Sequence, residues 1–407
     1  MEGANSALDQ FAFAGQRFAA RPLTNALTKR GHIMSASDHK GMQRRNWLKQ
    51  AAGAAAGLAL SNTLIGRATA ADPLVIGAIY VGPKDDYGWN QSHAVGIATL
   101  KKLPNVKVIE EEKVPETTAV ASTMESMIRQ DGAKLILGTS FGYFDPHMIN
   151  MAKKYPKVEF RHPSTLWTKG KHPDNLGGYF VFLDQAHYVD GAAAGLATKS
   201  NKIGFVAAKP IPIVLRNINA FTMAAKKANP KVVVNVVFTG EWSMPVREAE
   251  ATNSLVDSGC DVIACHVDSP KVVLETAEKR GAKSCGHNVA QGTIAPKGFI
   301  TGAENNYGAI YTAYAGMLAK GATLPNMLTG GYEKDMVTNT AYGASASAES
   351  KKSGDAAKAD MKAGKSMFVG PLKDNKGKVV LEKTVGNYDG VLDGMNYLVE
   401  GTTGSIT

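Results

Sequence analysis

Ser140, His266 and Asp268 are the side chains whose types could perform covalent chemistry, because serine, histidine and aspartate form the catalytic triad of many hydrolases. The serine is predicted to lie in one half of the chain, and the histidine and aspartate in the other. No Gly-x-Gly-x-x-Gly follows the first predicted strand, residues 74–81, so a dinucleotide cofactor is not expected. An enzyme is the rival to a binding protein as the class of this protein. Because the triad residues are divided between the two halves of the chain and no cofactor motif is present, we predict that the protein is not an enzyme.

Three cysteines could in principle form a redox or metal site: Cys260, Cys265 and Cys285. They include no Cys-x-x-Cys pair and have no His-x-x-x-His companion, so neither a zinc site nor a redox pair is indicated. We expect small buried residues on strands, and we predict neither a metal nor another cofactor.

Residues 1–70 have the pattern of a cleaved export leader. Arg44-Arg45 precede an apolar, alanine-rich run at 51–60, and the small-x-small signal Ala68-Thr69-Ala70 follows. Paired arginines before a weakly apolar run are typical of twin-arginine export. The run is far shorter than the ~20 residues that span a bilayer, and no cysteine follows it to carry a lipid. The predicted mature protein is a soluble, unanchored protein of the periplasm.

The positive charge of the chain owes much to this leader. The whole sequence has a net charge of +10, whereas residues after 70 hold 37 Lys and Arg against 33 Asp and Glu, a net charge of +4. No cluster of basic side chains in that part could neutralise a row of phosphates, so nucleic acid is excluded as a partner.

About 335 residues remain after the leader, more than a single core usually holds, so two domains are expected. Short β-branched runs alternate with helical stretches, which predicts an α/β fold with parallel sheets. The predicted strands are 74–81, 106–111, 134–139, 157–160, 179–183, 202–207, 231–238, 261–265, 283–286 and 299–303. The predicted helices are 91–102, 117–130, 146–154, 187–200, 213–228, 246–257, 270–280 and 307–320.

Two tandem series of this kind predict two Rossmann-like lobes that present their carboxyl strand ends to a shared cleft. Lobe 1 is predicted to comprise residues 71–185 and 304–325, and lobe 2 residues 186–303 and 326–407. Three hinge linkers are expected near 184–187, 303–306 and 322–331, and a hairpin near 368–381.

Several motifs resemble one known family. They are Asp86-Tyr87-Gly88-Trp89-Asn90 with Gly96, Gly138-Thr139-Ser140-Phe141-Gly142, Tyr155-Pro156-x-Val158-x-Phe160, Tyr188-Val189-x-Gly191 with Lys202-Ile203-Gly204-Phe205-Val206, Gly259-Cys260-Asp261-Val262-Ile263 and Met367-Phe368-Val369-Gly370-Pro371. Each is weak alone, but their order and spacing are similar to those of the basic membrane protein (BMP) family, the purine nucleoside receptor-like substrate-binding proteins of ABC importers.

This resemblance implies a type I periplasmic-binding fold and a purine base or nucleoside as ligand. It also implies an ABC permease in the inner membrane as partner, and we expect a monomer. A ligand-sensing receptor for a signalling protein is the alternative, which the sequence does not separate from transport. A nucleoside-processing hydrolase is the weaker alternative.

A flat purine is bound by aromatic faces together with a few amides, carboxylates or hydroxyls. Side chains of these types follow the predicted strands of both lobes. The candidate ligand-binding residues are Tyr87, Trp89, Asn90, Ser140, Phe141, Phe144, Asp145, Arg216, Trp242, His266, Asp268, Asn288 and Asn305.

Some of these candidates have structural alternatives. Phe141 and Phe144 could be core residues, and His266 could be a satisfied core histidine. Asn90 could cap the helix that follows it, Trp89 could pack against that helix, and Arg216 could lie on a solvated helix face.

One departure from the family pattern concerns the ligand. Nucleoside-binding relatives pair an aspartate with a lysine to hold the ribose hydroxyls, whereas this sequence has Gly286-His287-Asn288 and Glu304-Asn305 at the matching places. Charge-assisted hydrogen bonds to ribose are therefore lost. We accordingly expect a free purine base, or another small flat polar solute, over a nucleoside.

Overall fold

The computed structural model describes residues 72–406. The predicted leader, residues 1–70, lies outside the described residues. Pro73–Thr407 form one compact unit, and two parallel sheets within it carry the predicted lobes.

The first sheet has the strand order β11-β5-β4-β3-β1-β2, with all pairs parallel. Its strands are β1 (Leu74–Ile79), β2 (Val106–Glu111), β3 (Leu135–Gly138), β4 (Glu159–His162), β5 (Leu176–Val181) and β11 (Met327–Gly330). Its helices are α1 (Trp89–Leu100), α2 (Thr118–Arg129), α3 (Ile149–Lys154) and α8 (Tyr307–Ala319), with the short helical segments η1 (Phe141–Tyr143) and η2 (Phe144–Met148). We call this sheet and its helices lobe 1.

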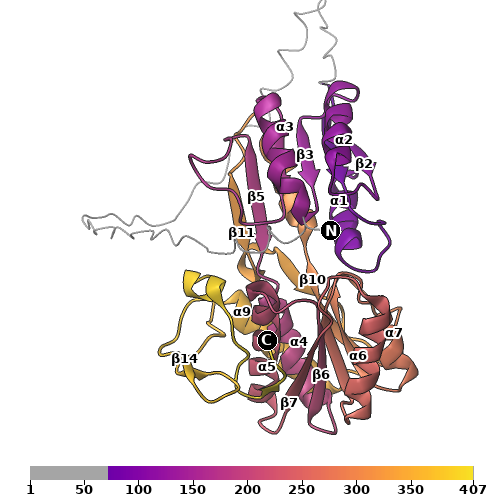
Figure 1. Ribbon diagram of the computed structural model, residues 1–407, viewed down its shortest axis with the longest axis vertical. Coiled ribbons are helices and arrows are strands. Elements are labelled where there is room, and N and C mark those ends of the chain that lie inside the picture. The colour runs from indigo at the N-terminus through magenta and orange to yellow at the C-terminus, as the bar shows by residue number, and fades with distance from the viewer. Residues whose placement is uncertain (1–71, 407) are drawn as a thin grey trace, which may run out of the picture. The chain divides into compact units, whose positions relative to one another are not determined.

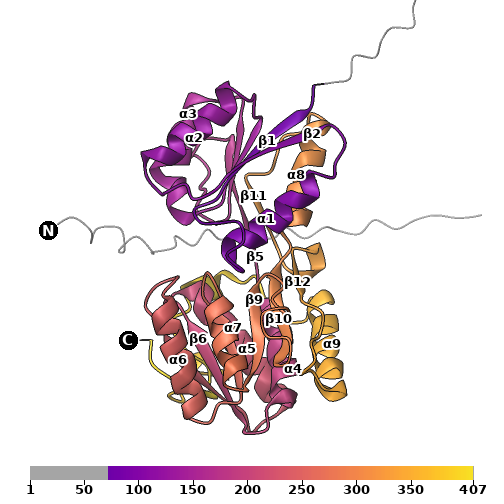
Figure 2. The ribbon, with the colours of Figure 1, turned by 90° about the vertical axis from the view of Figure 1, so that its right-hand side faces the viewer.

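Helices cover both faces of the first sheet, so its central strands read as continuous apolar runs. Along β1, Ile76 and Ala78 belong to the core beneath α1 and α8, whereas Val75 and Ile79 belong to the core beneath α2 and α3. Figure 2 shows α2 and α3 on one side of the sheet and α1 and α8 on the other. Both layers hold the carboxyl ends of β1 and β3 in place.

The second sheet has the order β12-β10-β9-β8-β6-β7-β15, and only β12 is antiparallel to its neighbour. Its strands are β6 (Lys202–Ala207), β7 (Val233–Phe238), β8 (Val262–His266), β9 (Lys283–Asn288), β10 (Phe299–Asn305), β12 (Val337–Asn339) and β15 (Thr402–Thr403). Its helices are α4 (Asp184–Ala197), α5 (Pro212–Ala228), α6 (Pro245–Asp257), α7 (Lys271–Lys279) and α9 (Ala348–Lys362). This is lobe 2 (Figure 1).

Helices α4 and α5 approach each other closely through glycine. A Cβ at Gly191 would lie 2.1 Å from the carbonyl oxygen of Phe221, and one at Gly195 would lie 2.6 Å from that of Ala225. Only glycine allows this backbone approach without a shift of one helix.

The chain crosses between the sheets three times. It passes from β5 to α4 at 182–183, returns from β10 to α8 at Asn306, and leaves again after β11 through η3 (Tyr332–Lys334) to β12. The first two crossings lie close to the predicted linkers 184–187 and 303–306.

The predicted boundary at 325/326 is wrong, because β11 pairs with β5 in the first sheet and the chain crosses after Gly330, at the end of the predicted linker 322–331. The predicted start of the return segment at 304 is also wrong, because β10 extends the second sheet to Asn305. Both errors concern short strand ends without a β-branched run.

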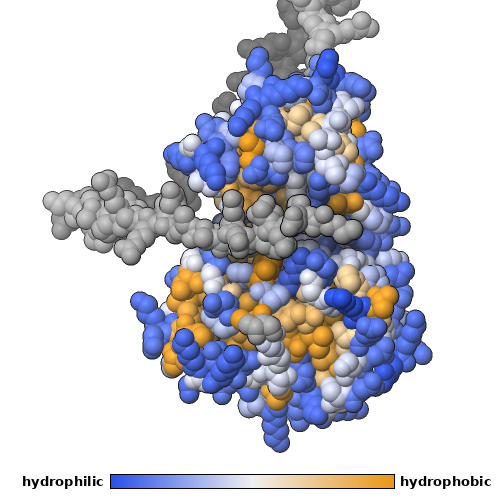
Figure 3. Space-filling model, viewed as in Figure 1, coloured by the Kyte–Doolittle hydropathy of each residue, from blue (hydrophilic) through white to orange (hydrophobic). Residues whose placement is uncertain are grey.

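The C-terminal segment, residues 363–406, packs on lobe 2. The predicted hairpin is present as the antiparallel pair β13 (Leu372–Lys373) and β14 (Val379–Leu381), followed by η4 (Gly390–Gly394). On the face drawn in Figure 3, apolar side chains are more frequent on the lower part, which carries lobe 2 and this segment. None of the helices within 72–406 is both long and apolar enough to span a bilayer.

The three cysteines are free and buried. Their predicted burial is confirmed, but their predicted location on strands is wrong for Cys260. Cys265 and Cys285 lie on β8 and β9, whereas Cys260 precedes β8. Burial raises the pKa of the Cys285 thiol well above its ordinary value, so this thiol is not activated for redox chemistry.

Candidate functional site

The candidate residues lie on loops at the carboxyl ends of strands in both sheets, and the loops after β1 and β8 touch. The backbone N–H of Trp89 donates to the carbonyl oxygen of Asp268 over 2.9 Å. The hydroxyl of Ser269 donates to the carbonyl of Asp86 over 2.6 Å. Strand ends of the two lobes therefore meet at one place.

The loop after β1 is organised by a carboxylate that the list of candidates did not include. Asp86 accepts hydrogen bonds from the backbone N–H groups of Gly88, Asn90 and Gln91, at 2.9, 3.0 and 2.9 Å. It thereby caps the start of α1, whose N-cap residue is Gly88. The alternative role of Asn90 as the cap is wrong, since Asp86 supplies the capping oxygens.

Asn90 is buried and bonded within its own loop. Its Oδ1 accepts from the N–H of Gly82 at 3.2 Å, and its Nδ2 donates to Asp86 at 2.8 Å. The side chain therefore stabilises the loop that presents its neighbours Tyr87 and Trp89. Tyr87 itself is half-buried, and its backbone φ of 57° is left-handed.

Trp89 links the loops after β1 and β3. Its indole Nε1 donates to the carbonyl oxygen of Thr139 at 2.8 Å, and its ring meets His93 edge to face with centroids 4.6 Å apart. The side chain is partly buried against the lobe 1 core. Part of its ring surface is therefore used for packing, which was the structural alternative for Trp89.

The four candidate residues on the loop after β3 differ in how exposed their side chains are. Phe144 is 3% exposed and belongs to the core. Phe141 is 57% exposed, and Asp145 is also exposed. Ser140 is buried and donates its hydroxyl to Glu116 over 2.5 Å. Phe141 is thus the aromatic side chain that this loop presents outward.

His162 supports the same loop from β4. Burial lowers the pKa of its imidazole to about 4, so the ring is neutral. Its Nε2 donates to the carbonyl of Ser140 and its Nδ1 bonds the hydroxyl of Ser164, each at 2.7 Å. The neutral ring fixes the backbone beside Phe141.

In lobe 2, Trp242, His266 and Asp268 form one group. The N–H of Asp268 donates to the carbonyl of Trp242 at 2.8 Å, and the indole and imidazole centroids lie 6.0 Å apart. Trp242 is partly buried. The structure therefore brings these three candidates together at the end of β8.

His266 is buried and neutral. Burial lowers its pKa to about 3, and its Nδ1 accepts from the amide of Asn217 at 2.9 Å, which leaves the ring proton on Nε2. Its ring also packs against His287, with centroids 4.2 Å apart. The Nδ1 of His266 thus has a hydrogen-bond partner within the protein, whereas its Nε2–H can donate to another group.

The pKa of the Asp268 carboxyl is shifted far from its ordinary value. Burial raises its pKa to about 7, and the carboxylates of Asp86, Glu248 and Glu116 contribute further. Near neutral pH this carboxyl can therefore both donate and accept a hydrogen bond. Within 72–406, no group of three or more His, Cys, Asp or Glu side chains could hold a metal ion.

Asn288 and Asn305 end the neighbouring strands β9 and β10. The Nδ2 of Asn305 donates to the Oδ1 of Asn288 at 3.0 Å, and both side chains are buried. Asn288 adopts a left-handed φ of 73°, a conformation that asparagine tolerates better than most residues. These two residues form a neutral, hydrogen-bonded pair.

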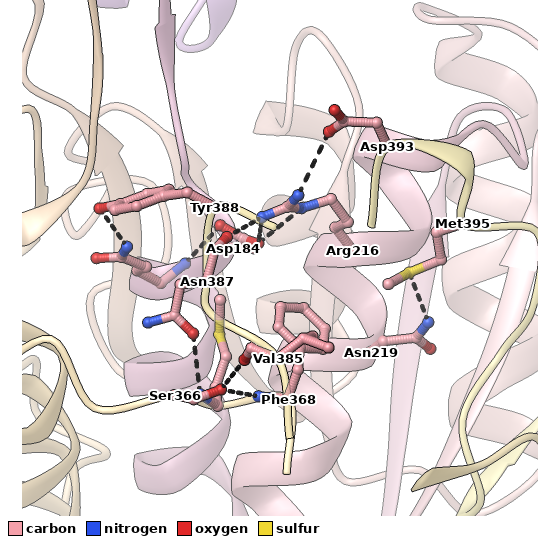
Figure 4. Close-up of polar contacts among 12 residues, drawn as sticks. Asp184, Arg216, Asn219, Ser366, Phe368, Val385, Asn387, Tyr388, Asp393 and Met395 are labelled. Carbon is pink, nitrogen blue, oxygen red and sulfur yellow. Dashed lines mark hydrogen bonds and ion pairs between the residues drawn. The ribbon is translucent and has the colours of Figure 1, made fainter. Parts of the chain in front are cut away.

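Arg216 is not brought together with the other candidates. Its Nε and Nη2 donate to Asp184 at 2.9 and 2.7 Å, and Nη2 also donates to the carbonyl of Asn387. Figure 4 shows the guanidinium between Asp184 and Asp393. Arg216 is buried rather than solvated, so it ties the start of α4 to the C-terminal segment.

A hydrolase triad is not assembled. Gly138-Thr139-Ser140-Phe141-Gly142 fits the Gly-x-Ser-x-Gly pattern, but Ser140 has an extended φ of −124° and ψ of 147°, unlike the strained turn of a nucleophile elbow. Its hydroxyl donates to Glu116, and His266 pairs with Asn217. The serine and the histidine thus serve separate loops.

Sequence reasoning missed Asp86, Glu116 and Gln291. Asp86 lies in a quoted motif, and its position three residues before the helix start at Trp89 was the available signal. Glu116 and Gln291 contact residues that are distant in sequence, so no local pattern identifies them.

Two sheets joined by three crossings, with polar and aromatic side chains at neighbouring strand ends, form a two-lobed α/β protein. The family model of PnrA-like ABC transporter substrate-binding proteins (Bmp) matches residues 74–349. A purine-binding protein of Brucella abortus (strain 2308) is 31% identical over 340 residues, covering 83% of this chain and 95% of that protein.

A putative ABC transporter glucose-binding protein of Haloferax volcanii is 31% identical over 261 residues, 63% of this chain and 62% of that protein. The solved structure of a solute-binding protein from Conexibacter woesei covers 72% of this chain and 97% of its own, with a TM-score of 0.62 at 20% identity. The chain belongs to the Bmp family of PnrA-like ABC transporter substrate-binding proteins, and the predicted type I periplasmic-binding fold is confirmed.

Proposed function

We propose that this protein captures a small planar solute, a purine base in preference to a nucleoside, between its two lobes for an ABC importer. The observation that carries the proposal is the meeting of the loops after β1 and β8 through Trp89 and Asp268. Around this contact lie the aromatic rings of Trp89 and Trp242 and the hydrogen-bonding groups of His266 and Asp268. A purine needs this combination of stacking faces and few polar groups.

The preference for a base rests on the neutral pair Asn288 and Asn305. Two asparagines offer no charge-assisted hydrogen bonds to ribose hydroxyls. Asp268 supports a purine of either kind, because a carboxyl with a pKa of about 7 can donate and accept toward the mixed hydrogen-bonding edge that bases and nucleosides share. The name of the Brucella relative agrees with this ligand class.

The partner and the location follow from the family. A liganded, closed form would dock on an ABC permease, and the twin-arginine leader would deliver the folded protein to the periplasm. A signalling partner in place of the permease is the alternative. Replacing Arg44-Arg45 by two lysines is expected to retain the precursor in the cytoplasm, because the export receptor recognises the arginines; normal export of this variant would contradict the leader assignment.

The ligand preference can be tested by isothermal titration calorimetry, which measures the affinity of each compound for protein that has been refolded to remove any copurified ligand. The panel is adenine, guanine and hypoxanthine, their nucleosides, and glucose, which the Haloferax relative brings into consideration. The expected order places bases first. Tighter nucleoside binding would overturn the preference for a base, and tighter glucose binding would overturn the purine proposal.

A further inference from the structure

Residues 86–89, which we call the closing loop, make direct hydrogen bonds from lobe 1 to lobe 2. Lobe 2 contributes the carbonyl of Asp268, the hydroxyl of Ser269 and the side-chain amide of Gln291. All three bind backbone groups of the loop: the N–H of Trp89 and the carbonyls of Asp86 and Tyr87. These bonds join protein to protein and need no ligand.

Both partners of this contact are fixed within their own lobes. The Asp86 carboxylate accepts three backbone N–H groups of the closing loop and of α1, which holds the loop carbonyls in place. Gln291 is fully buried, and its amide bonds both backbone groups of His287, at 2.9 Å from its N–H and 2.8 Å to its carbonyl. Its bond to the carbonyl of Tyr87 therefore requires no further ordering of the side chain.

Gly88 permits the approach. A Cβ at this position would lie 1.8 Å from the carbonyl oxygen of Asp268 and 2.9 Å from Cδ of Pro270. Real Cβ atoms do not come this close to backbone oxygen, so any side chain at residue 88 would force the loops apart. Next to it, the Lys271 ammonium lies 5.1 Å from the centroid of the Tyr87 ring, a distance at which a cation is attracted to the ring.

We propose that Ser269 and Gln291 are positioning residues that hold the lobes closed through the backbone of the closing loop, and that Gly88 is required for this closure. The closed form is then the main form before a solute arrives, and the solute is released only when these bonds open. This inference deepens the proposed function, but the closure can be measured without any solute.

Spin labels at Lys153→Cys on α3 and Lys279→Cys on α7 report the distance between the lobes by pulsed electron resonance. Both lysines are exposed, and the three native cysteines are buried, so labelling is selective. The variants are Gly88→Ala and Ser269→Ala. Gly316→Ala on α8 is the matched control, because a Cβ there meets nothing within 4 Å.

The ligand-free parent and the Gly316→Ala control are expected to give one short distance, Gly88→Ala a longer one, and Ser269→Ala a mixture of both. Adenine should leave Ser269→Ala about fivefold faster than the parent, the effect of one net hydrogen bond. If Gly88→Ala lowers the melting temperature, Ser269→Ala carries the test alone.

A long distance in the ligand-free parent, or unchanged distances in both variants, would overturn the inference. Failure of adenine to bind any variant would count against the proposed function instead, and it would leave the distances interpretable.

Discussion

Asp268→Asn is expected to stabilise the protein above neutral pH, because this carboxyl is costly to ionise where it lies. Moving its pKa from an ordinary value of 3.8 to about 7 corresponds to at most about 4 kcal/mol of unfavourable free energy for the charged form. The asparagine keeps the shape of the side chain and carries no charge. The stability difference between variant and parent should therefore grow with pH.

The sign follows from proton binding. Between pH 4 and 7 the folded protein holds the Asp268 proton, whereas the unfolded chain has already released it. The contribution of this group to stability is thus complete below pH 4 and is lost as the pH rises to about 7. Buried neutral histidines such as His266 act in the opposite direction over part of this range, so the parent alone does not isolate the effect.

Urea unfolding of the parent and of Asp268→Asn, at steps from pH 5 to pH 8, measures the difference directly. Asp145→Asn is the control, because that carboxylate is exposed, and its difference from the parent should stay near zero. Parallel profiles for the parent and Asp268→Asn would refute the assignment of a raised pKa to Asp268.

Three further substitutions test the site and the fold. Trp242→Ala should weaken binding of adenine by about 1 to 3 kcal/mol, the usual size of stacking on a base; unchanged affinity in calorimetry would remove it from the site. Gly191→Ala should lower the free energy of unfolding by ~1 to 3 kcal/mol, because its Cβ overlaps the carbonyl of Phe221, whereas Gly316→Ala should not. Arg216→Met should cost about 3 to 5 kcal/mol in denaturant unfolding, since it leaves the buried Asp184 carboxylate unpaired; a cost below 1 kcal/mol would contradict that ion pair.

Strands rich in β-branched residues could be predicted from the sequence almost to the residue. The expected strands 106–111 and 202–207 coincide with β2 and β6. The buried strand β6 is a nearly continuous apolar run, as expected within a parallel sheet, whereas the edge strand β2 is marked by the β-branched residues Val106, Val108 and Ile109. The edge strand β11 and helix α9 were not predicted. Met327–Gly330 is short, and Ala348–Lys362 has Met361 as its single large apolar residue. Neither segment therefore shows a hydrophobic period, and tertiary contacts decide their structure.

The site was predictable only at the level of loops. Trp242, His266 and Asp268 were selected because they follow predicted strands, and they do lie together in the structure. This criterion could not identify Arg216 as part of a buried ion pair, because Asp184 is 32 positions away in the sequence. Nor could it show that Phe144 faces the core while Phe141 is exposed, since both follow the same strand.

A crystal structure of the protein with adenine tests the central claim most directly. The account predicts the purine between the lobes, with its ring against Trp242 or Trp89 and its polar edge on Asp268. Adenine bound outside the cleft, or a closed cleft that stays empty at saturating adenine, would contradict it.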